Sequence, residues 1–193
     1  MAKNKKFTVL YRRKRNNKTD YKKRLRLLVS RKPRLVVRKG LRNITAQIIE
    51  YSPTGDRIIV SSNTREIKNL GWKGGLSNIP SAYLLGLKIA EKAKEKKIEF
   101  AILDKGIHQS IKGSAIYALV KGAVDNGLNV PHSKDIFPSE ERISGEHIKN
   151  YAEKIKNTEK YAKQFSNYEK NNFNVSNISE EFNKIKSQIM KNG

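Results

Sequence analysis

The sequence predicts an α/β protein with a mixed sheet, helices packed on that sheet, a basic N-terminal arm and a helical C-terminal extension. Residues 34–63 hold three short β-branched runs and a turn signal, which is typical of antiparallel strands. Residues 80–133 alternate between helical patterns and short apolar runs, which indicates a βαβ unit. The positive charge lies mainly before both regions, so an arm precedes the folded body.

Most of the charge is at the N-terminal end. Residues 1–42 hold eighteen Lys and Arg side chains against one acid and contribute +17 of the formal net charge of +23. Residues 1–17 show no apolar periodicity, which predicts an arm that stays disordered until a polyanion neutralises it. A charge field of this strength attracts nucleic acid or an anionic membrane surface.

A basic helix is expected after the arm, beginning at Thr19 and ended by Pro33. Thr19 or Asp20 can cap its first turn. The helix has an apolar face, expected to dock on the core, and a basic face, expected to meet phosphates. The apolar face holds Tyr21, Leu25, Leu28 and Val29, and the basic face holds Lys22, Lys23, Arg24 and Arg26.

Three antiparallel strands are expected next. Their sequences are "RLVVRK" (34–39), "NITAQIIEYS" (43–52) and "DRIIVSSN" (56–63). The second and third flank "PTG" (53–55), a turn signal that predicts a hairpin.

A Gly-rich loop and a long helix follow the strands. The loop is "NLGWKGGLSNIP" (69–80), and its Pro80 suits the first turn of a helix that runs to about Lys97. The inward positions of this helix are Ala82, Leu85, Ile89 and Ala93. A stripe of small residues is expected to let it lie close to the sheet; the stripe is Gly86, Ala90 and Ala93.

A βαβ unit completes the body. "IEFAILD" (98–104) has the apolar pattern of a buried parallel strand. A helix is expected from about Gly113 to Asn126-Gly127, followed by a last short strand, "LNVPHS" (128–133). The order strand, helix, strand predicts a right-handed crossover.

The C-terminal part is expected to be helical. After Pro138 we expect an amphipathic helix capped by Ser144, whose apolar side holds Ile148, Tyr151, Ala152 and Ile155. Residues 158–193 show a weaker period of Ile178, Phe182, Ile185 and Ile189 and are expected to be helical or partly ordered. The chain is therefore divided into an arm (1–17), an α/β domain (18–157) and a C-terminal extension (158–193).

The composition excludes several classes of protein. Without cysteine there is no disulfide, no Cys-based zinc site and no thiol nucleophile. The basic N-terminus has no apolar run behind it, so it is not a secretory signal. No uninterrupted apolar run approaches the roughly 20 residues of a membrane helix. We expect a soluble cytoplasmic protein that does not bind membranes.

The sequence shows no catalytic constellation. Three strands followed by a helix and a strand favour a ribonuclease-H-like nuclease as the alternative, but two-metal hydrolysis needs several converging carboxylates. Only Asp104 stands at a strand end, where it is expected to cap a turn or pair with a lysine. His108, His132 and His147 lack metal-ligand spacing. We expect no enzymatic activity, metal, cofactor or small-molecule substrate.

RNA is the expected polyanion. The polar residues 12–18 do not suit membrane insertion, and no groove-entering DNA motif is present. A localisation signal would explain "RRKR" (12–15) but not the basic helix or the later cations, which are Lys39, Arg42, Lys68 and Lys73. A cationic arm can order itself on folded RNA. The aromatic residues that could stack on bases, or instead pack in the core, are Tyr11, Tyr21 and Trp72.

Four blocks of the sequence resemble a known family. They are "YRRKRNNKTDYKKRLRLLVSRKPRLVVRK" (11–39), "GWKGGLSNIPSAYLLGL" (71–87), "AILDKGIHQSIKGSAIYALVKGAVDNGLNVPHS" (101–133) and "PSEERISGEHI" (138–148). Together they resemble the universal 5S rRNA-binding protein of the large ribosomal subunit, the eighteenth in the universal naming of large-subunit proteins, in its archaeal form. The resemblance covers about residues 7–157, in the expected order.

The resemblance implies a structural constituent of the ribosome. Its family binds 5S rRNA, helps attach it to the large-subunit rRNA in the central protuberance, and neighbours a second 5S-binding ribosomal protein and other large-subunit proteins. The α/β domain (18–157) would then be the 5S rRNA-binding domain. An assembly factor that leaves the mature particle remains the other non-enzymatic alternative.

Carried over by motif, the resemblance implies an RNA-binding set from three blocks. The arm-and-helix block gives Arg12, Arg13, Lys14, Arg15, Lys18, Thr19 and Tyr21. The loop block gives Trp72, Lys73 and Gly74, and the strand-to-helix block gives Lys105, Gly106 and Lys112. The charge pattern adds Lys22, Arg24, Arg26, Lys39 and Arg42.

Overall fold

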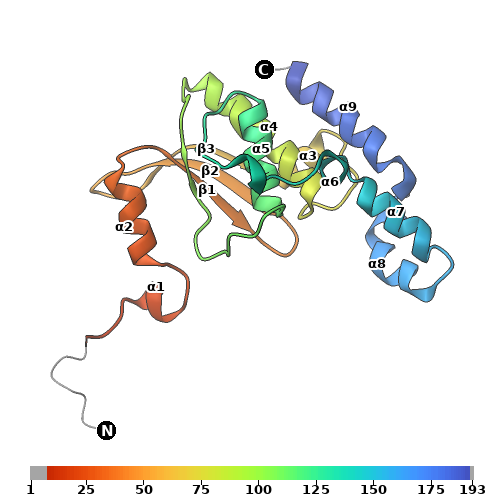
Figure 1. Cartoon of the computed structure of the whole chain (residues 1–193), viewed down its shortest axis with the longest axis horizontal. Coiled ribbons are helices and arrows are strands. Elements are labelled where there is room, and N and C mark those ends of the chain that lie inside the picture. Colours follow the sequence, from red (N-terminus) through yellow and green to blue (C-terminus); the bar gives the residue numbers. More distant parts are fainter. Residues whose placement is uncertain (1–7, 192–193) are drawn as a thin grey trace, which may run out of the picture.

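A four-stranded mixed sheet forms the centre of the protein (Figure 1). The structure is a computed structural model and describes residues 8–191, so the first seven residues of the expected arm lie outside the described residues. The strands, in the order β3-β2-β1-β4, are β1 Arg34–Lys39, β2 Ile44–Glu50, β3 Arg57–Asn63 and β4 Ile102–Asp104. Neighbours β1–β2 and β2–β3 are antiparallel, and β1–β4 is parallel. The predicted fold class is confirmed.

The two faces of the sheet have different surroundings. On β1, Leu35 and Val37 are fully buried in the hydrophobic core. Because side chains alternate along a strand, Arg34 and Val36 belong to the opposite face, where both line a cavity beneath the N-terminal helices. One face therefore builds the core, and the other meets the basic end of the chain.

Helices α4 Ile79–Glu95 and α5 Ala115–Asp125 cover the core face and cross each other closely. A Cβ added to Gly86 would lie 2.1 Å from the Leu119 carbonyl oxygen, and one added to Gly122 would lie 2.2 Å from the Tyr83 carbonyl oxygen. Gly86 was predicted to allow a close approach to the sheet. That prediction was wrong, because the element that lies close to Gly86 is the backbone of α5.

The expected last strand, residues 128–133, is reduced to one bridge. Phe100 pairs in parallel with Asn129, and the Asn129 N–H donates to the Glu99 carbonyl at 2.8 Å. Pro131 has no N–H with which to extend the ladder. Leu128 and Val130 are still buried, so the segment packs as expected without becoming a strand.

A short helix, α3 Thr64–Asn69, follows β3 and was not predicted. It begins with a capping box in which the Asn63 side chain accepts from the Arg65 N–H at 3.0 Å and Glu66 accepts from the Asn63 N–H at 3.2 Å. The Asn-x-x-Glu spacing at 63–66 is the sequence signal that could have found it.

The C-terminal part forms α6 Glu140–Ser144, α7 Glu146–Ile155, α8 Glu159–Lys170 and α9 Ile178–Lys191, with short 3₁₀ turns at Lys134–Ile136 and Val175–Asn177. Ser144 does not cap α7: its hydroxyl donates to the Glu141 carbonyl at 3.1 Å, and Gly145, with φ of 88°, makes the break. The face of α9 joins the main core through Ile178, Phe182, Ile185 and Ile189. The predicted helical C-terminal extension is confirmed.

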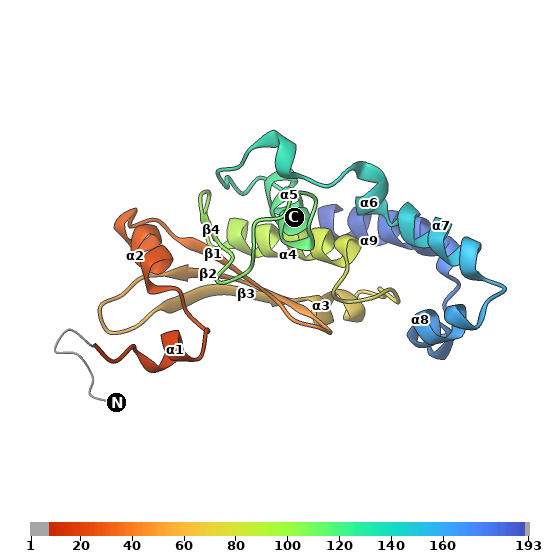
Figure 2. The same cartoon turned by 60° about the horizontal axis from the view of Figure 1, so that its bottom comes forward.

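The N-terminal end holds α1 Arg12–Arg15 and α2 Tyr21–Val29. The expectation of an unstructured arm was wrong for α1, where the backbone forms one helical turn. Asp20 caps α2 as predicted, accepting from the N–H groups of Lys22 and Lys23 at 3.1 Å each. Figures 1 and 2 place α1 and α2 at one end of an elongated molecule and α8 at the other.

The predicted apolar face of α2 was wrong in part. Leu25 is 65% exposed and Val29 is 74% exposed, whereas Leu27 and Leu28 are half-buried. No residue of α2 is fully buried. The helix meets the body along a different side from the one its apolar spacing suggested, because the ion pair of Arg24 with Asp56 orients it.

Candidate nucleic-acid interface

Two cavities lie at the basic end of the molecule. The first, of about 770 Å³, lies between α2 and the face of the sheet opposite the core and is called here the network cavity. The second, of about 560 Å³, lies between the α1 segment and the end of the sheet. Its lining consists of Arg13, Asn17, Lys18, Arg38, Lys39, Gly40, Asn43, Thr45, Ile107 and His108, so it is called the acid-free cavity.

In the network cavity, three arginines form ion pairs with two acids, Asp56 and Asp104. Arg24 Nη2 donates to both carboxylate oxygens of Asp56 at 3.0 Å. The buried Arg34 donates from Nη2 to Asp56 at 2.8 Å and from Nη1 to Asp104 at 2.9 Å. Arg38 reaches Asp104 Oδ1 at 3.3 Å and the Asp104 carbonyl at 2.8 Å. Helix α2, the β2–β3 turn, β1 and β4 are thus linked through one chain of ion pairs.

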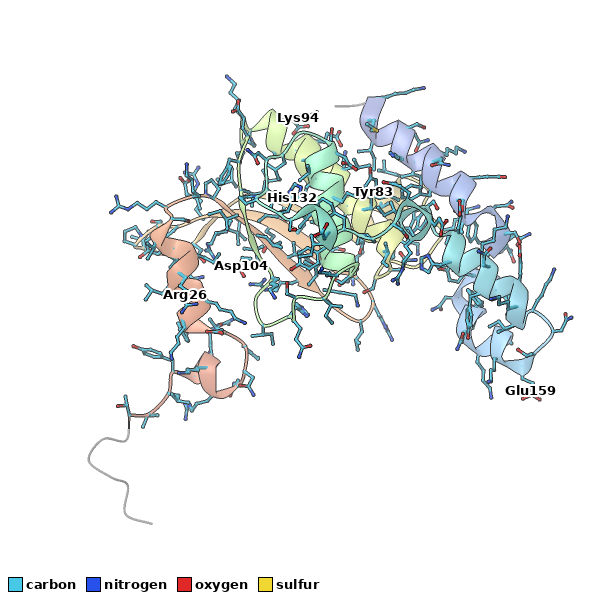
Figure 3. All side chains as sticks on the ribbon, viewed as in Figure 1. Arg26, Tyr83, Lys94, Asp104, His132 and Glu159 are labelled. Atoms are coloured by element: carbon cyan, nitrogen blue, oxygen red, sulfur yellow. The ribbon has the colours of Figure 1, made fainter. Side chains whose placement is uncertain are left out.

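Figure 3 shows Asp104 in the part of the molecule near α2, which carries Arg26, with Glu159 far from both. Asp104 also accepts from the Gly106 N–H at 2.9 Å. Of the two roles expected for Asp104, capping a turn or pairing with a lysine, the structure shows the first, and its ionic partners are Arg34 and Arg38.

The arginines hold Asp56 in its charged form. Burial alone would raise the pKa of Asp56, but hydrogen bonds and charges from Arg34 and Arg24 outweigh it, so the pKa lies below its usual value of 3.8. Near neutral pH this carboxylate is ionised and neutralises charge that would otherwise be free to attract phosphate.

The acid-free cavity has the opposite character. Its lining carries four cationic side chains, Arg13, Lys18, Arg38 and Lys39, and no carboxylate. Within residues 8–191, Arg38 is the one of these four that forms an ion pair, and its partner Asp104 lies outside the lining. Arg13 is held in place because its Nε donates to Thr19 Oγ1 at 2.9 Å. Gly106, with φ of 62°, lets the Arg38 guanidinium lie against its backbone, since a Cβ there would be 3.0 Å from Arg38 Cζ. This arrangement suits a phosphate group.

A further pair of cations flanks the network cavity. Burial, and then the charge of Lys23, lower the pKa of Lys105. Both side chains line the cavity, and the repulsion between them would be relieved by a bound anion.

The aromatic candidates divide into two groups. The rings of Tyr11 and Tyr21 lie 5.2 Å apart, and Tyr11 is 73% exposed, so one face is available for stacking. Trp72 is only 1% exposed, and its Nε1 donates to the Gly75 carbonyl at 3.1 Å. A ring this deeply buried is not available to stack on a base. Of the two roles considered for Trp72, the structure therefore shows core packing.

The Gly-rich loop 70–78 lies outside both cavities, between α8 and the β1–β2 turn. Gly75 N–H donates to the Tyr168 hydroxyl of α8 at 3.0 Å, and Gly74 leaves room for the Trp72 ring. The Ser77 hydroxyl donates to the Gly40 carbonyl at 2.7 Å, which joins the loop to the β1–β2 turn. The exposed Lys73 and Arg42 therefore lie on segments that continue from the acid-free cavity.

The structure brings together about half of the candidate residues. Those lining one or both cavities are Arg13, Lys18, Thr19, Tyr21, Arg24, Arg26, Lys39, Lys105 and Gly106. The candidates that are exposed outside the cavities are Arg12, Lys14, Arg15, Lys22, Arg42, Lys73 and Lys112. Gly74 is half-buried beside Trp72. Lys23, which was expected on the basic face of the helix, also lines the network cavity, whereas Arg34, Arg38 and Asp56 were not predicted from the sequence.

Nothing in residues 8–191 forms a group of three or more acidic, histidine or cysteine residues able to hold a metal ion. No helix in that range is both long and apolar enough to cross a membrane. Asp104, the residue on which the nuclease alternative depended, is held by Arg34 and Arg38.

Comparison with known proteins agrees with this geometry. The family described as "Ribosomal large subunit proteins 60S L5, and 50S L18" matches residues 5–99 and 90–133. The large ribosomal subunit protein uL18 of Methanococcus maripaludis is 46% identical over 191 residues, which is 98% of this chain and 99% of the relative. This family is one of ribosomal proteins and not of enzymes. The chain therefore belongs to the family of ribosomal large-subunit proteins 60S L5 and 50S L18.

Proposed function

We propose that this protein binds 5S rRNA within the large ribosomal subunit and helps attach it to the large-subunit rRNA in the central protuberance. The observation that carries the proposal is the acid-free cavity, where four cations converge with no carboxylate in the lining. A relative of nearly equal length that is named as a large-subunit protein supports the same conclusion.

Charge neutralisation is the main mechanism. Arg13, Lys18 and Lys39 contact backbone phosphates at the acid-free cavity, and Arg38 adds a guanidinium whose other contacts fix its orientation. Arginines can fork onto phosphates, whereas lysines supply point charge. Such contacts set the register of the protein on the RNA.

Helix α2 and its surroundings extend the contact. Lys22 and Arg26 are exposed on α2, and Lys105 lies across the network cavity from the same helix. Tyr11 offers an exposed ring to an unpaired base. In this proposal the arm (1–17) and the α/β domain (18–157) hold the RNA, and the extension (158–193) contributes α9 to the core.

The remaining surface is available to the neighbours that the family implies. These are the large-subunit rRNA, the second 5S-binding ribosomal protein and other large-subunit proteins, all in the cytoplasmic ribosome. The basic track from the acid-free cavity through the β1–β2 turn to Lys73 is the part proposed to meet the large-subunit rRNA.

The test is binding to folded 5S rRNA in Mg²⁺ at about 0.15 M salt, compared with a folded RNA of equal length and unrelated sequence. We expect one protein per 5S rRNA, intact RNA after incubation, and weaker binding to the control. The protein should also remain in salt-washed large subunits. Equal affinity for both RNAs, or loss from washed subunits, would contradict the proposal, and the second result would favour an assembly factor.

A further inference from the structure

Helix α2 lacks the attachment that holds the other long helices. None of its residues is fully buried, and its apolar residues Leu25 and Val29 face solvent. It carries four cations and lines the same cavity as Arg34 and Arg38 of β1 and Lys105, which follows β4. Repulsion between these groups would drive α2 away from the sheet unless an acid intervened.

Asp56 is that acid. It lies in the β2–β3 turn and binds Arg24 of α2 through both carboxylate oxygens at 3.0 Å. Its own position is fixed by Arg34, whose guanidinium donates to Asp56 at 2.8 Å and is braced from the other side by Asp104 at 2.9 Å. Arg34 is 1% exposed, so the brace is part of the folded interior.

Such an acid is unfavourable for RNA binding by charge alone. A carboxylate in a basic surface repels phosphates. It also pairs with cations that could otherwise neutralise phosphates and so release counterions from the RNA. Its presence between α2 and the sheet therefore has a structural reason, which is to fix the helix before RNA arrives. A surface ordered in advance loses less conformational entropy on binding.

We propose that Asp56, braced by Arg34, is a positioning residue that fixes the basic helix α2 over the sheet for RNA binding. The inference rests on the proposed function, since it concerns how the same surface is held. Asp56 touches no RNA in this account and acts only through Arg24.

The direction in which one substitution changes the RNA affinity distinguishes a positioning role from a simple charge effect. Asp56→Asn removes a negative charge, so charge alone predicts tighter binding to 5S rRNA. Positioning predicts the reverse, about 10-fold weaker binding at about 0.15 M salt. Asp56→Glu, which keeps the carboxylate, should restore most of the affinity.

The matched control is Glu50→Gln. Glu50 ends β2, is exposed and makes no ion pair within residues 8–191, and its replacement changes the net charge by the same amount. It should bind 5S rRNA as tightly as the unaltered protein or slightly more tightly. Asp56→Asn binding at least as tightly as Glu50→Gln would overturn the inference.

Hydrogen exchange tests the same point without RNA. In the free Asp56→Asn protein, the backbone amides of α2 should exchange at least about 10-fold faster, with those of α4 unchanged. Unchanged exchange in α2 would overturn the inference. If the unaltered protein does not bind 5S rRNA at all, the proposed function fails, and the exchange measurement still decides whether Asp56 holds α2.

A second pair of variants covers the case in which Asp56→Asn does not fold. Arg24→Gln breaks the link to α2 and leaves the Asp56–Arg34 pair, whereas Arg26→Gln removes an equal charge from the same helix without breaking that link. Faster α2 exchange and the larger loss of affinity are expected for Arg24→Gln. Equal effects of the two variants would contradict positioning.

Discussion

Helices α2 and α4 are held to the same sheet by different forces. Residues from Ile79 to Ala93 of α4 are buried almost continuously, and α4 packs closely on α5, whereas no residue of α2 is buried and a bidentate ion pair ties it to the β2–β3 turn. Apolar burial is not weakened by the screening of charges and is nearly insensitive to pH. Ion pairs depend on both.

The difference follows from what each helix must expose. A helix that presents cations to phosphates cannot also be wrapped in apolar side chains, so its orientation has to come from polar contacts. The apolar centre supplies stability, and the polar end supplies a binding surface whose geometry is fixed by Asp56 and Arg34. Changes in the apolar centre should therefore affect mainly stability, and changes at the polar end should affect mainly binding.

The largest effect on stability is expected from Phe182→Ala in α9. Phe182 is buried against the main core and its ring lies 5.7 Å from that of Tyr83. Its removal should lower the free energy of unfolding by about 3–5 kcal/mol, measured by chemical denaturation, with 5S rRNA affinity of the folded protein unchanged. Met190→Ala on the exposed side of α9 is the control, expected within about 0.5 kcal/mol. A loss below about 1 kcal/mol for Phe182→Ala would show that α9 does not support the core.

Removal of residues 1–17 should have the largest effect on binding. The seven Lys and Arg side chains removed with this segment include Arg13 of the acid-free cavity. Affinity for 5S rRNA should fall about 100-fold, and the slope of log affinity against log salt should decrease by about 0.7–0.9 for each phosphate that is no longer neutralised. Circular dichroism should show the helices and strands of the body retained. Equal affinity and equal salt slope in the shortened protein would contradict the role of the arm.

The ion pairs of Asp56 should make part of the stability dependent on acid. The pKa of Asp56 is lowered on folding, so its contribution is present above the unfolded value of about 3.8 and is lost as pH falls through the lower folded value. Between pH 5 and 7, Asp56→Asn should lower the free energy of unfolding by about 1–3 kcal/mol. The difference in free energy of unfolding between the two proteins should begin to shrink as pH falls towards 3.8 and should vanish only below the lower folded pKa of Asp56. A difference that stays constant down to pH 2 would rule out this carboxylate as its source.

The smallest effect is expected from Trp72→Phe, which tests whether Trp72 belongs to the apolar core or to the RNA-binding surface. Trp72 packs in the core and donates to the Gly75 carbonyl, so stability should fall by about 1–2 kcal/mol. Affinity for 5S rRNA should stay within about twofold, as measured by the same binding assay. A loss of affinity much larger than the loss of folded protein would indicate that Trp72 contacts the RNA.

The apolar half of the fold was predictable because its signals are local. The β-branched runs predicted β1, β2 and β3, and the helical spacing within α4 and α9 predicted residues that are buried in the structure. The misses were also local in origin. The capping box that begins α3 was not recognised, and Gly145, not Ser144, separates α6 from α7.

The polar half was predictable in composition but not in arrangement. The basic arm and helix were visible as charge, yet the pairing of Arg34 with Asp104 joins residues 70 positions apart, and that with Asp56 joins residues 22 apart. No periodicity records such contacts. The prediction that Leu25 and Val29 face the core failed for the same reason. The ion pair of Arg24 with Asp56 orients α2, and the apolar spacing of the helix does not.

The most direct measurement compares two double substitutions that remove equal charge from opposite ends of the molecule. Lys18→Gln with Lys39→Gln removes half of the positive charge of the acid-free cavity, and Lys156→Gln with Lys160→Gln alters exposed residues around the start of α8. Titration of 5S rRNA over a range of salt concentrations should show at least about a 10-fold loss of affinity and a salt slope reduced by about 1.4–1.8 for the first pair. The second pair should stay within about twofold of the unaltered protein. Equal losses for the two pairs would contradict the account, because binding would then follow net charge and not the surface built at the N-terminal end.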